Sequence, residues 1–439
     1  MTGLKRTLGF WALLAYGVGD ILGAGIYALV GKVAGAAGGA TWLAFGVAMA
    51  AAALTALSYA ELASRYPRSG GAATFCREAF GAEWAALLIG WLVLCSGVVS
   101  MATVSRGFAG YLGSFLPGLP LPAAVAGFLA LLGLINFRGI RESSGANILC
   151  TVIELSGLLL VVAVGAGFLL QVGTLFVPAP EAARPEIPVG SVLQGAALAF
   201  FALIGFEDMV NVAEEAHEPE KNLPRAMLAA VAIAGGLYML VGWVAVRVIP
   251  AAELAASPSP LLGVVQRAAP AFPLHLFSAV ALFAVSNTAL LNFVMGSRLV
   301  YGMAQEGLLP RRLGEVHPSR GTPHVAIGVI LLAAVALALS GGITRLAGTT
   351  SSLLLAVFIA VHGALLRIKS RASDGIRSPF TVPAFVPVLG VCSCLGLIAY
   401  MPTGSLKGAL LLAGLGGLLI LLRRVWGGGA GKEAGPKGR

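Results

Sequence analysis

Glycine interrupts two of the hydrophobic segments of this chain near their middle. The first segment carries Gly23, Ala24 and Gly25, and a second interruption at residues 204–207 reads IGFE. Glycine costs about 1 kcal/mol relative to alanine inside a helix, and backbone groups without partners are costly in lipid. A membrane helix therefore tolerates an unwound stretch only where protein, water or a ligand satisfies its N–H and C=O groups. Two such interruptions, one near the start of each half, predict a ligand site halfway across a bilayer.

The composition places nearly the whole chain in a membrane. Hydrophobic residues make up 58% of the 439 residues, charged residues only 11%, and the mean hydropathy is +0.91. Soluble domains carry about 25% charge, whereas a spanning helix needs about 20 apolar residues. This criterion predicts about twelve segments, at 8–35, 41–64, 82–111, 121–138, 144–170, 191–216, 224–249, 273–304, 323–340, 345–368, 382–401 and 405–425. The Pro-rich stretch 251–270 is predicted to be an outer loop with a short surface helix.

The positive charge follows the predicted topology. With the N-terminus in the cytoplasm, about 22 Lys and Arg side chains lie inside and about 7 outside, and the opposite orientation inverts this ratio. Both termini are therefore predicted to be cytoplasmic, and the net charge of +10 does not indicate a nucleic acid partner. The first segment is too long and too rich in glycine for a cleavable signal peptide. The five cysteines fall in predicted helices or cytoplasmic loops, which argues against a disulfide framework or a zinc site.

The predicted fold is an all-α integral membrane protein with one transport domain. Residues 1–425 form this domain, and the Gly- and Lys-rich tail 426–439 is predicted to be disordered. The placement of the interruptions predicts two five-helix units, at about 8–170 and 191–368, followed by two extra helices at about 382–425. An odd number of helices in each unit inverts the second unit relative to the first.

The first interruption offers both partners that an α-amino acid needs. The half-helix that begins near Gly25 presents free N–H groups and the positive end of its dipole, which suit a carboxylate. The carbonyls that end the preceding half-helix, near Ile21, suit an ammonium group. In the alternative interpretation, Gly23 and Gly25 only allow helices to pack closely.

The interruption at Gly205 is followed by two acidic residues. Glu207 and Asp208 lie near the predicted centre of the bilayer, where an ionised side chain costs roughly 3 kcal/mol or more. They should face a cavity or pair with polar groups. Glu207 has a structural alternative, which is to cap the N–H groups freed at the break. Phe201 and Phe206 could cover a ligand, and the alternative for both is ordinary packing.

Four stretches resemble signatures of the amino acid–polyamine–organocation (APC) transporter superfamily. They are residues 19–27 (GDILGAGIY), 201–207 (FALIGFE), 214–226 (EEAHEPEKNLPRA) and 297–310 (SRLVYGMAQEGLLP). Together they span nearly the whole predicted ten-helix core. The resemblance is closest to the bacterial amino acid permeases and the cationic amino acid transporters.

The resemblance implies a leucine-transporter-type fold, with discontinuous helices 1 and 6, that works by alternating access. Helices 1, 2, 6 and 7 would form the moving bundle. The substrate carboxylate would contact the amides of Ala24, Gly25 and Ile26. The ammonium group would contact the carbonyls of Ile21, Phe201 and Ile204.

Glu154 departs from the family pattern, because several proton-coupled relatives carry a lysine at this position. Burial penalises the ionised form of a carboxyl group, so Glu154 could load and release a proton during transport. Its carboxylate could instead bind Na⁺, with carbonyls of the first segment and a hydroxyl such as that of Ser286 or Thr288. The third interpretation is a neutral glutamate hydrogen-bonded between helices. Asp20 could meet the substrate ammonium, a cationic side chain or a proton.

The sequence therefore predicts a secondary transporter of L-α-amino acids in the plasma membrane of a prokaryotic cell, coupled to protons as a symporter. Ion-independent exchange of amino acids and amines is the alternative, and a non-transporting nutrient sensor is the alternative from another class. No histidine or cysteine set at ligand spacing supports an enzyme. We expect no cofactor besides the proton gradient, with Na⁺ as the second choice, and no partner beyond the substrate and the bilayer. The side-chain pocket is expected near Ser96, Ser100, Thr103 and Asn287.

Overall fold

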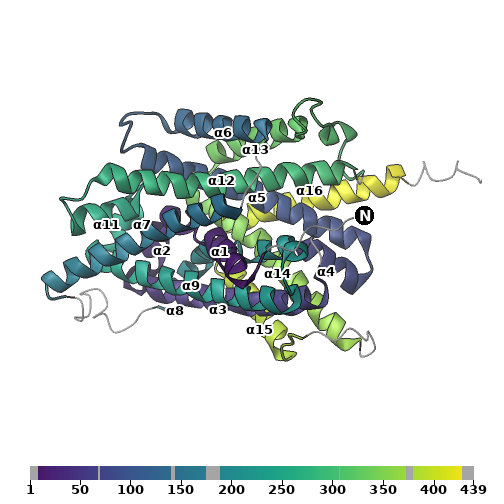
Figure 1. Ribbon diagram of the computed structural model, residues 1–439, viewed down its shortest axis with the longest axis horizontal. Coiled ribbons are helices and arrows are strands. Elements are labelled where there is room, and N and C mark those ends of the chain that lie inside the picture. The colour runs from purple at the N-terminus through teal and green to yellow at the C-terminus, as the bar shows by residue number, and fades with distance from the viewer. Residues whose placement is uncertain are drawn as a thin grey trace, which may run out of the picture.

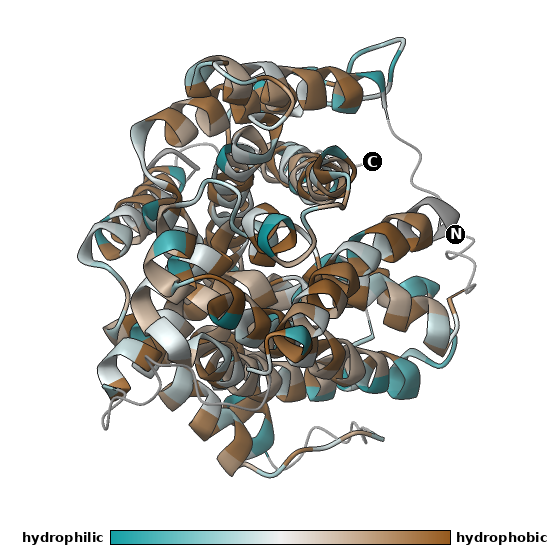
Figure 2. Ribbon diagram, turned by 90° about the vertical axis from the view of Figure 1, so that its left-hand side faces the viewer, coloured by the Kyte–Doolittle hydropathy of each residue, from teal (hydrophilic) through white to brown (hydrophobic). Residues whose placement is uncertain are grey.

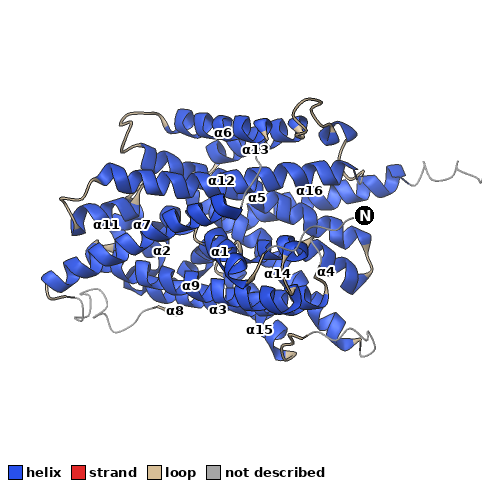
Figure 3. Cartoon of the chain, in the orientation of Figure 1, coloured by secondary structure: helices blue, strands red, loops and turns tan. Residues whose placement is uncertain are grey.

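The computed structural model describes residues 8–67, 70–139, 144–174, 188–305, 307–371 and 379–427. Throughout these ranges the secondary structure is helical, without a strand (Figure 3). The elements that match the predicted segments are α1 (Phe10–Ile21) with α2 (Ala24–Ala37), α3 (Thr41–Arg65), α5 (Glu83–Leu112), α6 (Leu121–Arg138), α7 (Ser144–Gln171), α8 (Val189–Ala199) with η2 (Phe200–Leu203) and η3 (Phe206–Glu215), α9 (Pro219–Val248), α12 (Leu274–Gln305), α13 (His324–Ser340), α14 (Ile343–Ser370), α15 (Phe385–Ala399) and α16 (Thr403–Gly427). The connecting elements are η1 (Gly38–Ala40), α4 (Gly71–Phe80), α10 (Ala251–Ala256), α11 (Pro260–Ala268) and η4 (Arg311–Gly314).

These helices are long and apolar enough for a membrane protein. In the described chain, nine helical stretches meet the length and hydropathy expected of a membrane span, and one of them joins α2 to α3. The shorter apolar helices α1, α13 and α15 complete the set. Each of the twelve predicted segments therefore has a helical counterpart in the structure.

The outer surface of the helix bundle is apolar. Leu332 on α13 and Leu410 on α16 are both 71% exposed, and leucines on several other helices also point outward. Seen along the long axis of the molecule, hydrophobic residues cover much of the peripheral helices (Figure 2). Exposed apolar surface of this extent is stable in contact with lipid but not with water.

Helices that lie five segments apart in the chain pack against each other. α3 packs on α9, α5 packs on α12, and α6 packs on α13. In Figure 1, α1 lies at the centre of the bundle, while α6 and α13 run together along one outer edge. Two five-helix units related by a pseudo-twofold axis would pair their second, third and fourth helices in this way. The boundaries of the two units stay a prediction.

The stretch 251–270 differs from the single surface helix that was expected. It forms two short helices, α10 and α11, because Pro260 begins a second helix after the break at residues 257–259. Leu254 and Leu261 are almost fully buried. The backbone of α10 passes so close to Gly31 that a Cβ atom there would lie 2.2 Å from the Leu254 carbonyl oxygen. The two helices thus cover one end of α2.

At the end of the molecule opposite to α10 and α11, a buried carboxylate joins three parts of the chain. Glu61 on α3 is 0% exposed, and its side chain lies 2.6 Å from the Arg65 guanidinium and 2.7 Å from the Lys369 ammonium on α14. It also accepts a hydrogen bond of 2.8 Å from the backbone N–H of Val382. This network ties α3 to α14 and to the segment that leads into α15. The tail predicted to be disordered, 426–439, lies almost wholly outside the described residues, which end at Gly427.

Candidate functional site

Both predicted interruptions are present. α1 ends at Ile21 and α2 begins at Ala24, so only Leu22 and Gly23 separate the half-helices. In the sixth segment, η2 ends at Leu203 and η3 begins at Phe206. Gly205 lies between them with φ of +128°, a conformation that L-residues rarely adopt.

The two breaks lie against each other, although they are far apart in the sequence. A Cβ atom on Gly25 would lie 2.4 Å from the Cα of Ala202. A Cβ atom on Gly205 would lie 2.8 Å from the backbone oxygen of Asp20. In both places backbone meets backbone, where only glycine leaves room. The glycines therefore provide both the break and the close packing that the sequence offered as alternatives.

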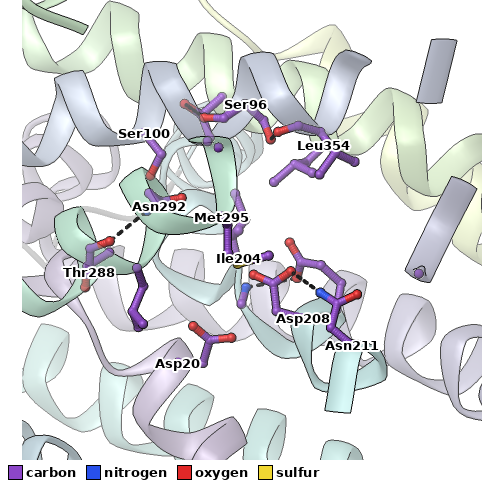
Figure 4. Close-up of a pocket in the computed structure, with 18 of the residues that line it drawn as sticks. Asp20, Ser96, Ser100, Ile204, Asp208, Asn211, Thr288, Asn292, Met295 and Leu354 are labelled. Atoms are coloured by element: carbon purple, nitrogen blue, oxygen red, sulfur yellow. Dashed lines mark hydrogen bonds between the residues drawn. The ribbon is translucent and has the colours of Figure 1, made fainter. Parts of the chain in front are cut away.

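A cavity of about 200 Å³ lies where the two breaks meet. Its wall is contributed by α1, α2, α3, α4, α5, η2, η3, α12 and α14, with Asp20 and Asp208 on the opposite side from Ser100 and Asn292 (Figure 4). The predicted site residues that line it are Asp20, Ile21, Gly23, Ala24, Gly25, Phe201, Ile204, Gly205 and Glu207, together with Ser96 and Ser100 from the expected side-chain pocket.

Other residues expected at the site lie outside the cavity wall. Ile26 is fully buried in the protein, and the ring of Phe206 packs against Tyr59 and Phe358. Ser286 hydrogen-bonds to the carbonyl of Leu282 in its own helix. Glu154, Thr103 and Asn287 are also absent from the lining.

The first break is held by two hydrogen bonds from other helices. The N–H of Ala24 donates to the Oγ1 of Thr288 over 2.9 Å, and the hydroxyl of Tyr238 donates to the carbonyl of Ile21 over 2.6 Å. The Ala24 amide, expected to bind a substrate carboxylate, is thus paired with a hydroxyl group. A carboxylate would share or replace that partner. The Ile21 carbonyl has two lone pairs and can accept from an ammonium group as well.

Glu207 caps the second break. One of its carboxylate oxygens accepts a hydrogen bond of 2.9 Å from the N–H of Gly205. This is the structural role that the sequence left open. Asp208 accepts a hydrogen bond of 3.3 Å from the side chain of Asn211. Both acidic residues line the cavity, so the cap and the cavity wall are built from the same groups.

The charge of the cavity is one-sided. Asp20, Glu207 and Asp208 contribute carboxyl groups, and the described lining includes no lysine or arginine. Asn211 and Asn292 add amide groups that can both donate and accept. Such a lining favours a ligand that carries at least one ammonium group, and it leaves the start of α2 as the natural partner of an anionic group.

The side-chain region of the cavity is formed largely by one stripe of α12. Thr288, Leu291, Asn292 and Met295 line it at spacings of three and four residues, which place them on one face of the helix. Leu354 of α14 faces the same space (Figure 4). From the sequence, Thr288 was expected only as a possible Na⁺ ligand, and Leu291, Asn292, Met295 and Leu354 were missed. Thr288 and Asn292, two polar residues one turn apart in an apolar helix, were the available signal.

Glu154 lies behind the cavity and is connected to it through α12. Its side chain is 0% exposed, and one carboxyl oxygen accepts a hydrogen bond of 3.0 Å from Asn287. The other oxygen is buried and has no hydrogen-bond partner among the described residues. Asn287 is followed directly by Thr288, which accepts the N–H of Ala24. Two consecutive residues of α12 therefore link the carboxyl group to the first break.

The cavity reaches the molecular surface beside α4. Gly70, which is exposed, and Asn211 form its outer part. On the other side of the breaks the chain is tightly packed. There the ring of Tyr27 contacts the rings of Tyr111 and Phe277, and the side chain of Lys32 is hydrogen-bonded to the carbonyl of Ala255. The cavity is thus open towards one end of the molecule and closed towards the other.

The ends of the two broken segments beside this opening are joined. The N–H of Leu8 donates to the carbonyl of Glu215 over 3.0 Å, and the N–H of His217 donates to the carbonyl of Leu8 over 2.8 Å. This short parallel bridge attaches the start of α1 to the end of η3. The two half-helices that border the opening are therefore coupled to each other.

Comparison with known proteins gives a consistent result. The sequence model of a family described as amino acid permease matches residues 8–418. The chain is 31% identical over 419 residues to the branched-chain amino acid permease of Bacillus subtilis, covering 90% of this chain and 88% of that protein. It is 30% identical over 423 residues to the methylthioribose transporter of the same organism, covering 91% of this chain and 89% of that protein. It is also 30% identical over 394 residues to the vacuolar cationic amino acid transporter 4 of Arabidopsis thaliana, covering 85% of this chain and 65% of that protein.

Proposed function

Since this chain belongs to the amino acid permease family, we propose that it is a secondary transporter that carries L-α-amino acids across the plasma membrane in symport with protons. Its family and relatives are transporters and not enzymes. The observation that carries the proposal is the contact between the two broken segments around a cavity lined by carboxyl groups.

The main chain at the breaks supplies partners for both ends of a zwitterion. The carboxylate of the substrate lies at the start of α2, where the N–H groups of Gly25 and Ile26 precede the first intrahelical hydrogen bonds. The hydroxyl of Thr288 then serves the Ala24 amide in the empty state. The ammonium group lies towards the carbonyl of Ile21 and the carboxylate of Asp20. Because the same main-chain groups serve every α-amino acid, the side chain is selected by the stripe on α12 and by Leu354.

The opening of the cavity corresponds to an inward-open state. Positively charged residues favour the cytoplasmic side, and the end of the molecule beside α4 carries Arg65, Arg77 and Lys369. The termini are cytoplasmic in this orientation. Substrate binding shifts the population towards states in which the bundle of segments 1, 2, 6 and 7 has rotated against the rest. The bridge from Leu8 to the end of η3 keeps the two broken segments together during this movement.

Glu154 carries the coupling proton in this mechanism. Its buried carboxyl group is stable only when neutral or when paired, and one of its oxygens has no hydrogen-bond partner in the part of the chain that the structure describes. Proton release requires water to reach it in one state of the cycle. No cofactor is needed, since the energy comes from the proton gradient, and Na⁺ is the competing ion.

Uptake by purified protein in liposomes tests the function. An inward-directed proton gradient is expected to drive accumulation of the amino acid that binds, a protonophore should abolish it, and replacement of Na⁺ by K⁺ should not matter. Uptake that requires counter-substrate inside and ignores the pH gradient would instead establish exchange. A panel of amino acids together with methylthioribose, the ligand named for one relative, identifies the substrate.

The variant Glu154→Gln tests the coupling residue. Glutamine preserves the size of the side chain and the contact with Asn287 but carries no titratable proton. We expect it to lose accumulation driven by the pH gradient while still exchanging labelled for unlabelled substrate. The matched control is Glu253→Gln, which changes a glutamate whose side chain is 59% exposed on α10. An unchanged pH profile in Glu154→Gln would exclude this residue as the proton carrier.

A further inference from the structure

A second cavity lies at the cytoplasmic ends of α6 and α12 and shares no lining residue with the first. Its volume is about 640 Å³. The polar part of its wall comes from Asn136 and Arg138 of α6, Ser297, Arg298 and Tyr301 of α12, and Arg320 and Thr322 in the loop before α13. Three of these residues, Ser297, Arg298 and Tyr301, belong to the stretch 297–310, and none of the three lines the first cavity.

The cavity is strongly positive. Its three arginines form no ion pair with any described residue, and no aspartate or glutamate occurs in the described lining. The guanidinium carbon of Arg320 lies 5.9 Å from the ring centroid of Phe137. Three like charges around one cavity repel each other, and an anion bound among them removes that repulsion.

The loop that carries Arg320 is fixed onto the end of α6. The hydroxyl of Thr322 donates to the carbonyl of Phe137 over 3.0 Å, and the N–H of His317 donates to the carbonyl of Thr322 over 2.9 Å. Gly321 closes the turn with φ of +68° and donates its N–H to the carbonyl of His317 over 2.9 Å. These hydrogen bonds therefore fix the position of Arg320 at the cavity.

The floor of the cavity is polar and ordered. Asn136 is 6% exposed and Ser297 1% exposed. The side-chain amide of Asn136 donates to the Oγ of Ser297 over 3.2 Å and to the carbonyl of Phe293 over 3.3 Å. The general enrichment of arginine on the cytoplasmic side of membrane proteins would explain the positive charge of this region, but nothing more. It requires neither a shared cavity nor a buried polar floor.

The surface next to this cavity faces lipid. α6 and α13 run along the outer edge of the bundle (Figure 1), and they expose Leu131, Leu134, Val329 and Leu332, each between 45% and 71%. A lipid whose acyl chains lie against these residues would place its head group at the end of α6. Basic pockets between helices on the cytoplasmic side are suited to anionic head groups.

We propose that the cavity bounded by Arg138, Arg298 and Arg320 binds a phosphate-bearing anion, and that its source is the head group of an anionic phospholipid in the cytoplasmic leaflet. The guanidinium groups donate charge-assisted hydrogen bonds to the phosphate oxygens. The hydroxyl of Tyr301 lies in the same wall and is a further donor.

Native mass spectrometry of the purified chain, titrated with phosphatidylglycerol or phosphatidylcholine, tests the site. We expect phosphatidylglycerol to bind more tightly, and increasingly so at low ionic strength. Each arginine changed to glutamine should weaken the binding about fivefold, which corresponds to about 1 kcal/mol per basic residue near an anionic surface. The combined variant R138Q/R298Q/R320Q should therefore lose the preference between the two lipids.

The control is R311Q/R312Q/R371Q, which removes the same charge from exposed positions at the same end of the molecule that do not line the cavity. It should keep the lipid preference. The single variant Arg320→Gln provides the test if the combined variant does not fold. Equal binding of the two lipids by the unmodified chain, or an equal loss in both triple variants, overturns the proposal.

Inorganic phosphate identifies the source of the anion. Added to protein in phosphatidylcholine nanodiscs, it should raise the thermal unfolding midpoint less than phosphatidylglycerol does. An equal rise that the three cavity substitutions abolish would overturn the lipid as the source and would support a site for soluble phosphate. Substrate uptake by each variant reports whether the transport domain is still folded.

Discussion

Gly205 is the position at which one added methyl group should do the most damage. Its φ of +128° is a conformation that a residue with a side chain adopts only under strain, and such strain costs about 1–3 kcal/mol of stability. The Cβ of an alanine would also lie 2.8 Å from the carbonyl oxygen of Asp20, 2.9 Å from its carbonyl carbon and 3.2 Å from the N–H nitrogen of Ile21. These are backbone atoms, and overpacking of this kind costs about 1–3 kcal/mol more.

The two costs together predict that Gly205→Ala loses about 2–6 kcal/mol in the state described here. Relief of the clash would require the end of α1 to move away from the sixth segment, and the cavity lies between these two segments. We therefore expect a lower thermal unfolding midpoint in detergent together with loss of uptake in liposomes. The matched control is Gly236→Ala on α9, because no heavy atom lies within 4 Å of a Cβ at that glycine.

The comparison between the two variants is informative in both directions. Gly236→Ala should unfold at or above the midpoint of the unmodified protein, since alanine is the better helix former. If Gly205→Ala had the same midpoint and the same uptake as Gly236→Ala, the two breaks could not be in backbone contact. That result would refute a site formed by the contact of the two broken segments.

Three further substitutions probe the surroundings of the site. Thr288→Val removes the acceptor of the Ala24 amide, at a cost of about 1–3 kcal/mol, so the thermal unfolding midpoint without substrate should fall, while the rise caused by substrate should increase. Thr288→Ser should restore the midpoints measured with and without substrate. An unchanged rise in Thr288→Val would show that substrate does not share the amide. Tyr238→Phe removes the donor that holds the carbonyl of Ile21, and a loss of about 1 kcal/mol should raise KM for uptake about fivefold; an unaltered KM would contradict this. Glu61→Gln removes the counter-charge of two partly buried cations, Arg65 and Lys369, and should cost about 3 kcal/mol, the lower end of the range for a broken buried pair. Chemical denaturation measures this loss, and substrate affinity should not change because Glu61 lies outside the cavity.

The class of protein could be predicted from the sequence because its causes are local. Apolar segments of sufficient length predict spans wherever they occur, and glycine predicts where a span unwinds. The resemblance to amino acid permeases is confirmed by the family match, and the predicted all-α membrane fold with discontinuous first and sixth helices is confirmed as well. Proton coupling and the topology of the termini stay predictions.

The direction of individual side chains was harder to predict. No local pattern indicates that the half-helix after Gly205 is a 3-10 helix, which has three residues per turn where an α-helix has 3.6. Phe206 consequently packs against Tyr59, while Glu207 and Asp208 border the cavity. An argument based on an ordinary α-helix cannot assign these faces.

Partners that are distant in the chain were beyond sequence reasoning. Ala24 and Thr288 are 264 residues apart, and from the sequence the Thr288 hydroxyl was expected near the first segment only as a possible Na⁺ ligand, not as the acceptor of an amide. The rotation of α12 was equally uncertain, because lipid and protein interior are both apolar and hydropathy does not separate the two faces of such a helix. A search for polar residues one turn apart would have found Thr288 and Asn292.

The link between Glu154 and the first break has a consequence for coupling. Asn287 donates to Glu154, and the next residue, Thr288, accepts from Ala24, so a shift or rotation of this turn of α12 alters both hydrogen bonds together. Substrate that replaces Thr288 at the Ala24 amide changes one bond, and protonation of Glu154 changes the other. Each event therefore alters the free energy of the other, and by linkage the effect is equal in both directions. Substrate affinity should depend on pH in the unmodified protein, and this dependence should vanish in Glu154→Gln; a dependence that survives the substitution would require a different titrating group.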